Sequence, residues 1–181
     1  MDIEYIEGVF MNRILKIALD FILLIVAYFR FCYKPWRANG RKTLVVNTLM
    51  YVYLSLVLFV TLMPVVASLP GIFNHPYKPM QMIPFDDLIH KRGDALRQIL
   101  LNTVMTIPFG FLLPLVKKQS IFTCILWTFL FSLAIELLQP LLNGLRSADV
   151  TDLITNTAGG IIGYAGYLLL KPYYLKIEKK F

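Results

Sequence analysis

The stretch SIFTCILWTFLFSLAIELLQPLL, residues 120–142, decides what kind of fold this chain can adopt. Its 23 residues include a single charged side chain, that of Glu136. A helix rises about 1.5 Å per residue, so a stretch of this length crosses the roughly 30 Å hydrocarbon core of a bilayer. We therefore expect residues 120–142 to form a transmembrane helix.

Four more apolar runs of similar length lie on either side of this stretch. They are residues 14–31, 44–68, 99–116 and 150–170. Hydrophobic residues make up 57% of the chain and charged residues only 16%, whereas soluble domains are about 45–50% apolar. The mean hydropathy is +0.64. We predict an all-α integral membrane protein, a bundle of about five transmembrane helices.

The basic residues indicate an orientation in the membrane. Eleven of the 18 Lys and Arg lie in segments 30–42, 117–118 and 171–180, which an alternating path of five spans places on one side. Lys and Arg beside membrane spans remain in the cytoplasm. We expect a multi-pass protein with its N-terminus outside and its C-terminus inside. Bases gathered beside apolar runs bind lipid headgroups, so we expect membrane lipids and no nucleic acid as partners.

The segment between the second and third runs is too polar to span a membrane. Its part 86–99 mixes Leu and Ile with Lys and Arg, which is typical of a short helix lying in the outer membrane interface. An ordinary loop fits the same residues equally well.

Polar side chains form a stripe along one face of the fourth run. Ser132, Glu136, Gln139 and Asn143 are spaced i, i+4, i+7 and i+11, which places them within an arc of roughly 60°. A carboxylate is costly in lipid, by about 2.5 kcal/mol or more at the bilayer centre. We expect this face to lie against protein or a wet cavity.

The fifth run carries a second polar face, formed by Asp149, Asp152 and Asn156. Gly159 and Gly163 continue it as a small-xxx-small pattern, which allows two helices to approach closely. The link between the fourth and fifth runs is short, so these helices are expected to be antiparallel neighbours.

These features together predict an outward-facing polar pocket. Its expected residues are Asn102, Glu136, Gln139, Arg146, Asp149, Asp152 and Asn156. Structural alternatives stay open: the two aspartates fit a helix cap, and Glu136 and Asn156 fit hydrogen bonds between helices. Lys16 and Asp20, spaced i, i+4, are interpreted as a structural pair. We expect no metal and no cofactor.

Four stretches resemble the VanZ-like family of bacterial membrane proteins. They are IPF (83–85), LNTVMTIPFGFLLPL (101–115), SLAIELLQ (132–139) and RSADVTDLITNTAGGIIGY (146–164). The motif residues matched by the resemblance are Asn102, Pro108, Gly110, Glu136, Gln139, Arg146, Asp149, Asp152, Asn156, Gly159, Gly160 and Gly163. The resemblance implies a cell-envelope protein of the bacterial cytoplasmic membrane, associated with low-level resistance to the glycopeptide teicoplanin. It implies no settled biochemical activity.

The resemblance also suggests a division of the chain. Residues 44–171 correspond to the family core, 1–43 add a transmembrane helix with a basic cytoplasmic linker, and 172–181 form a basic cytoplasmic tail.

Several functions compete for such a protein. We favour a non-enzymatic protein that binds an amphiphile, either a lipid-linked cell-wall precursor or a lipoglycopeptide. One alternative is an intramembrane enzyme acting on a lipid headgroup, with Glu136, Asp149 and Asp152 as acid/base groups or cation ligands and Arg146 on a phosphate. A lipid transporter subunit and a purely structural protein are the others.

Overall fold

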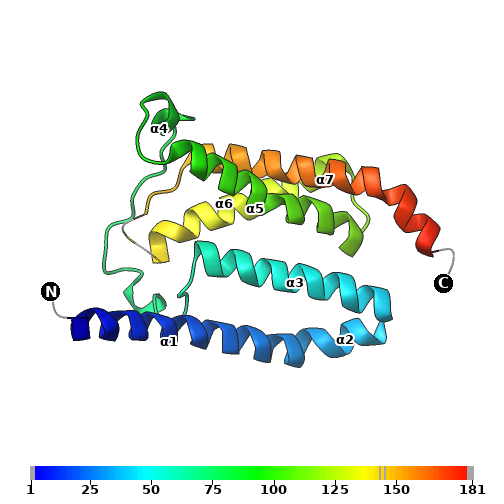
Figure 1. The fold of residues 1–181 in the computed structure, drawn as a ribbon, viewed down its shortest axis with the longest axis horizontal. Coiled ribbons are helices and arrows are strands. Elements are labelled where there is room, and N and C mark those ends of the chain that lie inside the picture. Colours follow the sequence, from blue (N-terminus) through cyan, green and yellow to red (C-terminus); the bar gives the residue numbers. More distant parts are fainter. Residues whose placement is uncertain (1–2, 143, 145, 179–181) are drawn as a thin grey trace. The chain divides into compact units, whose positions relative to one another are not determined.

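The computed structural model describes residues 3–142, 144 and 146–178, and within them the chain is helical (Figure 1). The elements are α1 (Ile3–Ala27), the π-helix η1 (Tyr28–Cys32), α2 (Tyr33–Ala38), α3 (Arg41–Thr61), the 3-10 helix η2 (Leu69–Gly71), α4 (Asp86–Ile89), α5 (Ala95–Val116), α6 (Ile121–Leu142) and α7 (Val150–Glu178). No β-strand occurs in these residues; one isolated parallel bridge joins Gln81 and Asp149. The all-α prediction is confirmed.

Four of the described helices are long and apolar enough to cross a membrane. They are α3, α5, α6 and the part Val150–Tyr173 of α7. The expected span 14–31 is also helical, since it falls on α1 and η1, but it is not one of the four. Three charged residues, Arg13, Lys16 and Asp20, lie close together within α1. The protein is thus a helical membrane protein in which α1 differs in character from the later helices.

The chain forms two compact units, which we call unit 1 and unit 2. Unit 1 consists of Met1–Lys78 and Leu138–Arg146, and unit 2 of Pro79–Leu137 and Ser147–Phe181. The last turn of α6 therefore belongs to unit 1 and the rest of that helix to unit 2. The predicted domain boundaries at residues 43 and 171 stay predictions.

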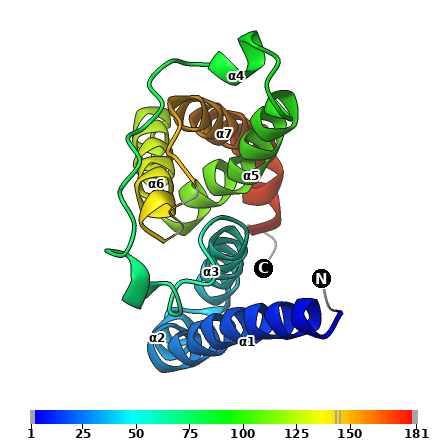
Figure 2. The same ribbon diagram turned by 90° about the vertical axis from the view of Figure 1, so that its left-hand side faces the viewer.

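In unit 1, α1 and α3 lie side by side and run in opposite directions (Figure 2). The reversal occurs at Gly40, whose φ of 98° favours glycine because it has no Cβ. Two tyrosines of this hairpin bridge the helices: the Tyr28 hydroxyl lies 2.8 Å from Thr48 Oγ1, and the Tyr51 hydroxyl donates to the Leu24 carbonyl at 2.7 Å. This hairpin aligns the start of α1 with the end of α3.

Unit 2 is built around a close approach of α5 and α7. A Cβ added to Gly159 or Gly163 would collide with the Thr103 or Ile107 carbonyl oxygen of α5. A Cβ added to Gly110 would likewise collide with the backbone carbonyl of Gly160 on α7. Figure 2 shows α5, α6 and α7 gathered into one bundle. Glycine at these positions allows the backbones of α5 and α7 to pack in direct contact, which brings the polar start of α7 close to α5.

The segment between η2 and α5 contains the four-residue helix α4. Apolar side chains of this region are exposed, notably Met82, Ile89 and Leu96. Arg92 pairs with Asp86 and, at 3.1 Å, with Asp87. A short helix and an ordinary loop were both open for this segment, and the structure has a short helix; its place at the membrane interface stays a prediction.

Candidate functional site

The predicted pocket residues fall into both units. Gln139 and Arg146 belong to unit 1, whereas Asn102, Glu136, Asp149, Asp152 and Asn156 belong to unit 2. The two groups have different surroundings, so each is described within its own unit.

In unit 2, Glu136 accepts a hydrogen bond at the start of α7. The backbone N–H of Asp149 donates to Glu136 Oε2 at 3.0 Å, and Glu136 is only 2% exposed. The short link between α6 and α7 makes this contact possible. The acidic side chain thus lies against protein, as the polar stripe on the fourth run led us to expect.

Asn156, one of the least exposed polar residues of unit 2, joins α7 to both neighbouring helices. Its Nδ2 donates to Ser132 Oγ of α6 at 2.9 Å, and its backbone carbonyl accepts the Thr106 hydroxyl of α5 at 2.7 Å. Asn156 is 1% exposed, and its Oδ1 has no hydrogen-bond partner among the described residues. These bonds give Asn156 a cross-linking role between three helices.

Asp149 caps α7. Its Oδ1 accepts the backbone N–H of Thr151 at 2.7 Å, and α7 begins one residue after Asp149. A carboxylate at this position satisfies a free N–H and interacts favourably with the helix dipole. The Phe85 N–H, on the preceding loop, donates to the Thr151 hydroxyl at 2.9 Å, and Gln81 forms a backbone bridge to the same turn. The capping alternative therefore explains Asp149.

Asp149 and the half-buried Asp152 line a cavity of about 10 Å³, together with Asp87 and Gln98. That volume is the size of a single water molecule. The described residues contain no group of three or more His, Cys, Asp or Glu arranged to hold a metal ion. We call Glu136, Asp149, Asp152 and Asn156 the polar core of unit 2; the cavity beside it is small.

Asn102 is separate from this core. It is half-buried on α5, and its backbone carbonyl accepts the Thr106 hydroxyl at 3.2 Å. Among the described residues, no hydrogen bond joins its side chain to the other candidates.

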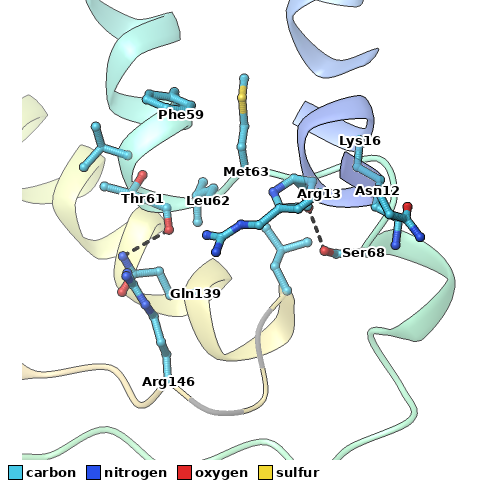
Figure 3. Close-up of a pocket in the computed structure, with 13 residues that line it drawn as sticks. Asn12, Arg13, Lys16, Phe59, Thr61, Leu62, Met63, Ser68, Gln139 and Arg146 are labelled. Carbon is cyan, nitrogen blue, oxygen red and sulfur yellow. Dashed lines mark hydrogen bonds between the residues drawn. The ribbon is translucent and has the colours of Figure 1, made fainter. Parts of the chain in front are cut away.

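A much larger pocket, about 480 Å³, lies in unit 1, and Gln139 and Arg146 line it. The start of α1 forms the other side with Asn12, Arg13 and Lys16 (Figure 3). Gln139 is nearly buried, and its Nε2 donates to the Thr61 carbonyl at 3.4 Å. The volume lies within the range of about 300–1,000 Å³ typical of small-molecule sites.

The sequence analysis did not predict that Asn12 and Arg13 line a pocket, and it gave Lys16 only a structural role. The expected pair of Lys16 with Asp20 was wrong: Asp20 accepts the backbone N–H groups of Val65, at 2.6 Å, and Val66, at 3.1 Å. No ion pair joins it to Lys16 in the part of the chain that the structure describes. The sequence did contain one indication of this pocket wall: two basic residues, Arg13 and Lys16, stand at the start of an apolar run, on the side of the membrane where few Lys and Arg are expected.

Comparison with known proteins places the chain in a family. The VanZ/LLP1 family model matches residues 17–171. This chain belongs to the VanZ/LLP1 family. It is 28% identical over 120 residues to Protein VanZ of Enterococcus faecium, an alignment covering 66% of this chain and 71% of that protein. No solved structure matches the chain.

The family match confirms the resemblance seen in the sequence. It includes Gln139, Arg146 and the polar core of unit 2, and it begins just after Lys16. This VanZ-family protein thus has one pocket wall within the matched residues and a second wall, at Arg13 and Lys16, that precedes them.

Proposed function

We propose that this VanZ-family protein is a non-enzymatic binding protein of the bacterial cell envelope, and that it takes an amphiphile into the pocket of unit 1. The amphiphile is a lipid-linked cell-wall precursor or a lipoglycopeptide, and binding lowers susceptibility to teicoplanin slightly. The observation that supports this is the 480 Å³ pocket, in which Gln139 and Arg146 meet apolar side chains such as Phe59 and Leu62. A ligand with a polar head and an apolar tail matches such a lining.

The proposed orientation puts this pocket at the outer face of the cytoplasmic membrane. The pocket lies at the start of α1, the end of α3 and the end of α6. With the N-terminus outside and the C-terminus inside, all three of these helix ends are external. Wall precursors and glycopeptides are both encountered at this face.

In this proposal the polar core of unit 2 has a structural role and does not bind the ligand. Asp149 caps α7, and its backbone N–H donates to Glu136. Asp152, Asn156 and Asn102 belong to the same unit. Residues on the pocket wall are therefore expected to affect binding, and residues of the core to affect stability.

Two substitutions test this proposal. Arg146→Ala should weaken teicoplanin protection and the retention of co-purifying lipid, because it removes a charged pocket wall. Glu136→Gln should change neither by much, because a glutamine Oε1 still accepts the Asp149 N–H. Susceptibility of cells expressing each protein, with membrane levels matched by immunoblot, and mass spectrometry of bound lipid are the measurements. If Arg146→Ala left both unchanged at wild-type expression, the proposal would be wrong.

The intramembrane enzyme has weaker support. Its acid/base groups would be Glu136, Asp149 and Asp152, but one oxygen of Glu136 and one of Asp149 accept backbone N–H groups. The cavity beside Asp149 and Asp152 has no room for a headgroup. Turnover of lipid phosphates by the purified protein, with and without Mg²⁺, would favour the enzyme over a binding protein. Among the described residues, no observation specifically supports the alternative of a lipid transporter subunit.

A further inference from the structure

We infer that the unit 1 pocket recognises a phosphate group, and that the hydrocarbon chain attached to it lies in the groove between α1 and α3. This inference rests on the proposed function and names its ligand chemistry: a phosphorylated lipid rather than a neutral amphiphile. The deciding residues are Arg13, Lys16 and Arg146.

The pocket concentrates positive charge. Arg13, Lys16 and Arg146 all line it, and none of its lining residues is Asp or Glu. Within the described residues, no carboxylate pairs with any of these three cations. Like charges that line one pocket repel each other, so this lining favours an anionic ligand.

Asp20, the one acidic residue in the part of α1 from residue 12 to 27, does not neutralise this charge. Asp20 is 4% exposed, and its two oxygens accept the N–H groups of Val65 and Val66. These bonds are needed because the chain leaves α3 there and its backbone N–H groups have no helical partner. Asp20 therefore stabilises the turn after α3, and among the described side chains no carboxylate neutralises Arg13 or Lys16.

The chemistry of the cations favours phosphate. Two guanidinium groups and one ammonium group offer many donors, and guanidinium forks match the geometry of phosphate oxygens. The Gln139 and Asn12 amides add uncharged donors on opposite sides of the pocket (Figure 3). A phosphate carries up to two charges and several acceptor oxygens, so it satisfies more of these groups than a carboxylate.

An apolar groove adjoins the charged pocket. It has a volume of about 280 Å³ and is lined by residues of α1 and α3 that include Phe21, Leu24 and Leu56. Phe59 lines the pocket and Phe21 lines the groove, and their ring centroids are 5.6 Å apart. The charged and apolar sites thus follow one another along the same helix pair, as the head and tail of a lipid would.

The test uses the full-length protein in detergent and three probes. These are phosphatidic acid, diacylglycerol with the same acyl chains, and inorganic phosphate, with binding followed by native mass spectrometry and by displacement of a fluorescent lipid. Phosphatidic acid should bind at least about tenfold more tightly than diacylglycerol. Equal binding of the two lipids would overturn the phosphate inference. Displacement by inorganic phosphate at the same concentration as the lipid would instead assign the site to free phosphate.

Matched variants separate this site from general charge effects. Arg13→Gln with Lys16→Gln should weaken phosphatidic acid binding by about tenfold or more. Lys117→Gln with Lys118→Gln removes the same charge from exposed positions outside the pocket and should leave binding unchanged. Equal effects of the two double variants would refute the inference. Arg13→Lys with Lys16→Arg retains the charge and should restore binding, which excludes misfolding as the cause.

The failure of this inference differs from the failure of the proposed function. If diacylglycerol and phosphatidic acid bound equally, and Arg146→Ala still released lipid and lowered teicoplanin protection, the binding function would stand without phosphate recognition. If wild-type protein bound neither lipid and gave no protection, both would fall.

Discussion

Replacing Gly163 by alanine should destabilise the protein markedly, although alanine is the better helix former. A Cβ at Gly163 would collide with the Ile107 carbonyl oxygen and lie 2.8 Å from the Phe111 nitrogen, both backbone atoms of α5. Backbone atoms within a helix cannot rotate away, so α5 and α7 must move apart. Overpacking of this kind costs about 1–3 kcal/mol.

Gly166 provides a control on the same helix. A Cβ there would meet only a Phe111 ring carbon at 3.9 Å, an ordinary contact. Gly166→Ala should therefore show only the gain of about 0.5–1 kcal/mol that alanine brings to a helix. Since Gly163→Ala includes the same gain, the difference between the two variants isolates the overpacking of about 1–3 kcal/mol.

Thermal unfolding of both purified variants in one detergent measures this difference. For a chain of this size, about 1 kcal/mol shifts the midpoint by about 2–4 °C. Gly163→Ala should unfold about 2–12 °C below Gly166→Ala, and Gly166→Ala at or slightly above wild type. Equal midpoints for the two variants would show that α5 and α7 do not approach as closely as described.

Two further predictions concern unit 1 and the orientation. Asp20→Leu should lower the free energy of unfolding by about 2–4 kcal/mol, because two backbone N–H groups lose a charged acceptor. Asp94→Asn, which removes a carboxylate from an exposed ion pair, should change the free energy of unfolding by less than about 1 kcal/mol. Chemical unfolding of both variants measures these changes, and similar losses for the two variants would contradict the prediction. In a cysteine-free background, a cysteine at Lys78 should react with a membrane-impermeant maleimide in intact cells and one at Lys118 should not, as measured by gel shift. The opposite labelling pattern would reverse the proposed orientation.

The membrane helices of this protein could be predicted because hydrophobic length is a local property. The predicted span 120–142 corresponds to α6, whose first residue differs from the prediction by one position, and the predicted span 150–170 corresponds to the first part of α7. The proximity of Glu136 to the start of α7 was also predictable, since six residues between the polar stripe and the next helix leave little freedom. Periodicity and chain length suffice for such contacts.

The pocket of unit 1 could not be predicted in the same way. Gln139 was assigned to a polar face, but periodicity does not tell which helix packs on that face. Its hydrogen-bond partner, Thr61, lies 78 positions away in the sequence. The opposite wall, at Arg13 and Lys16, is further still, and only folding of the α1–α3 hairpin brings these segments together.

The bonds from Asp20 to Val65 and Val66 limit how far this protein can be shortened. A chain trimmed to begin at Leu44 would retain most of α3 yet lose the Asp20 carboxylate, which accepts the N–H groups of the turn after that helix. Those two amides would then need water or lipid headgroups as acceptors, and neither holds a turn in one conformation. The smallest fragment worth expressing for crystallisation or spectroscopy therefore includes α1.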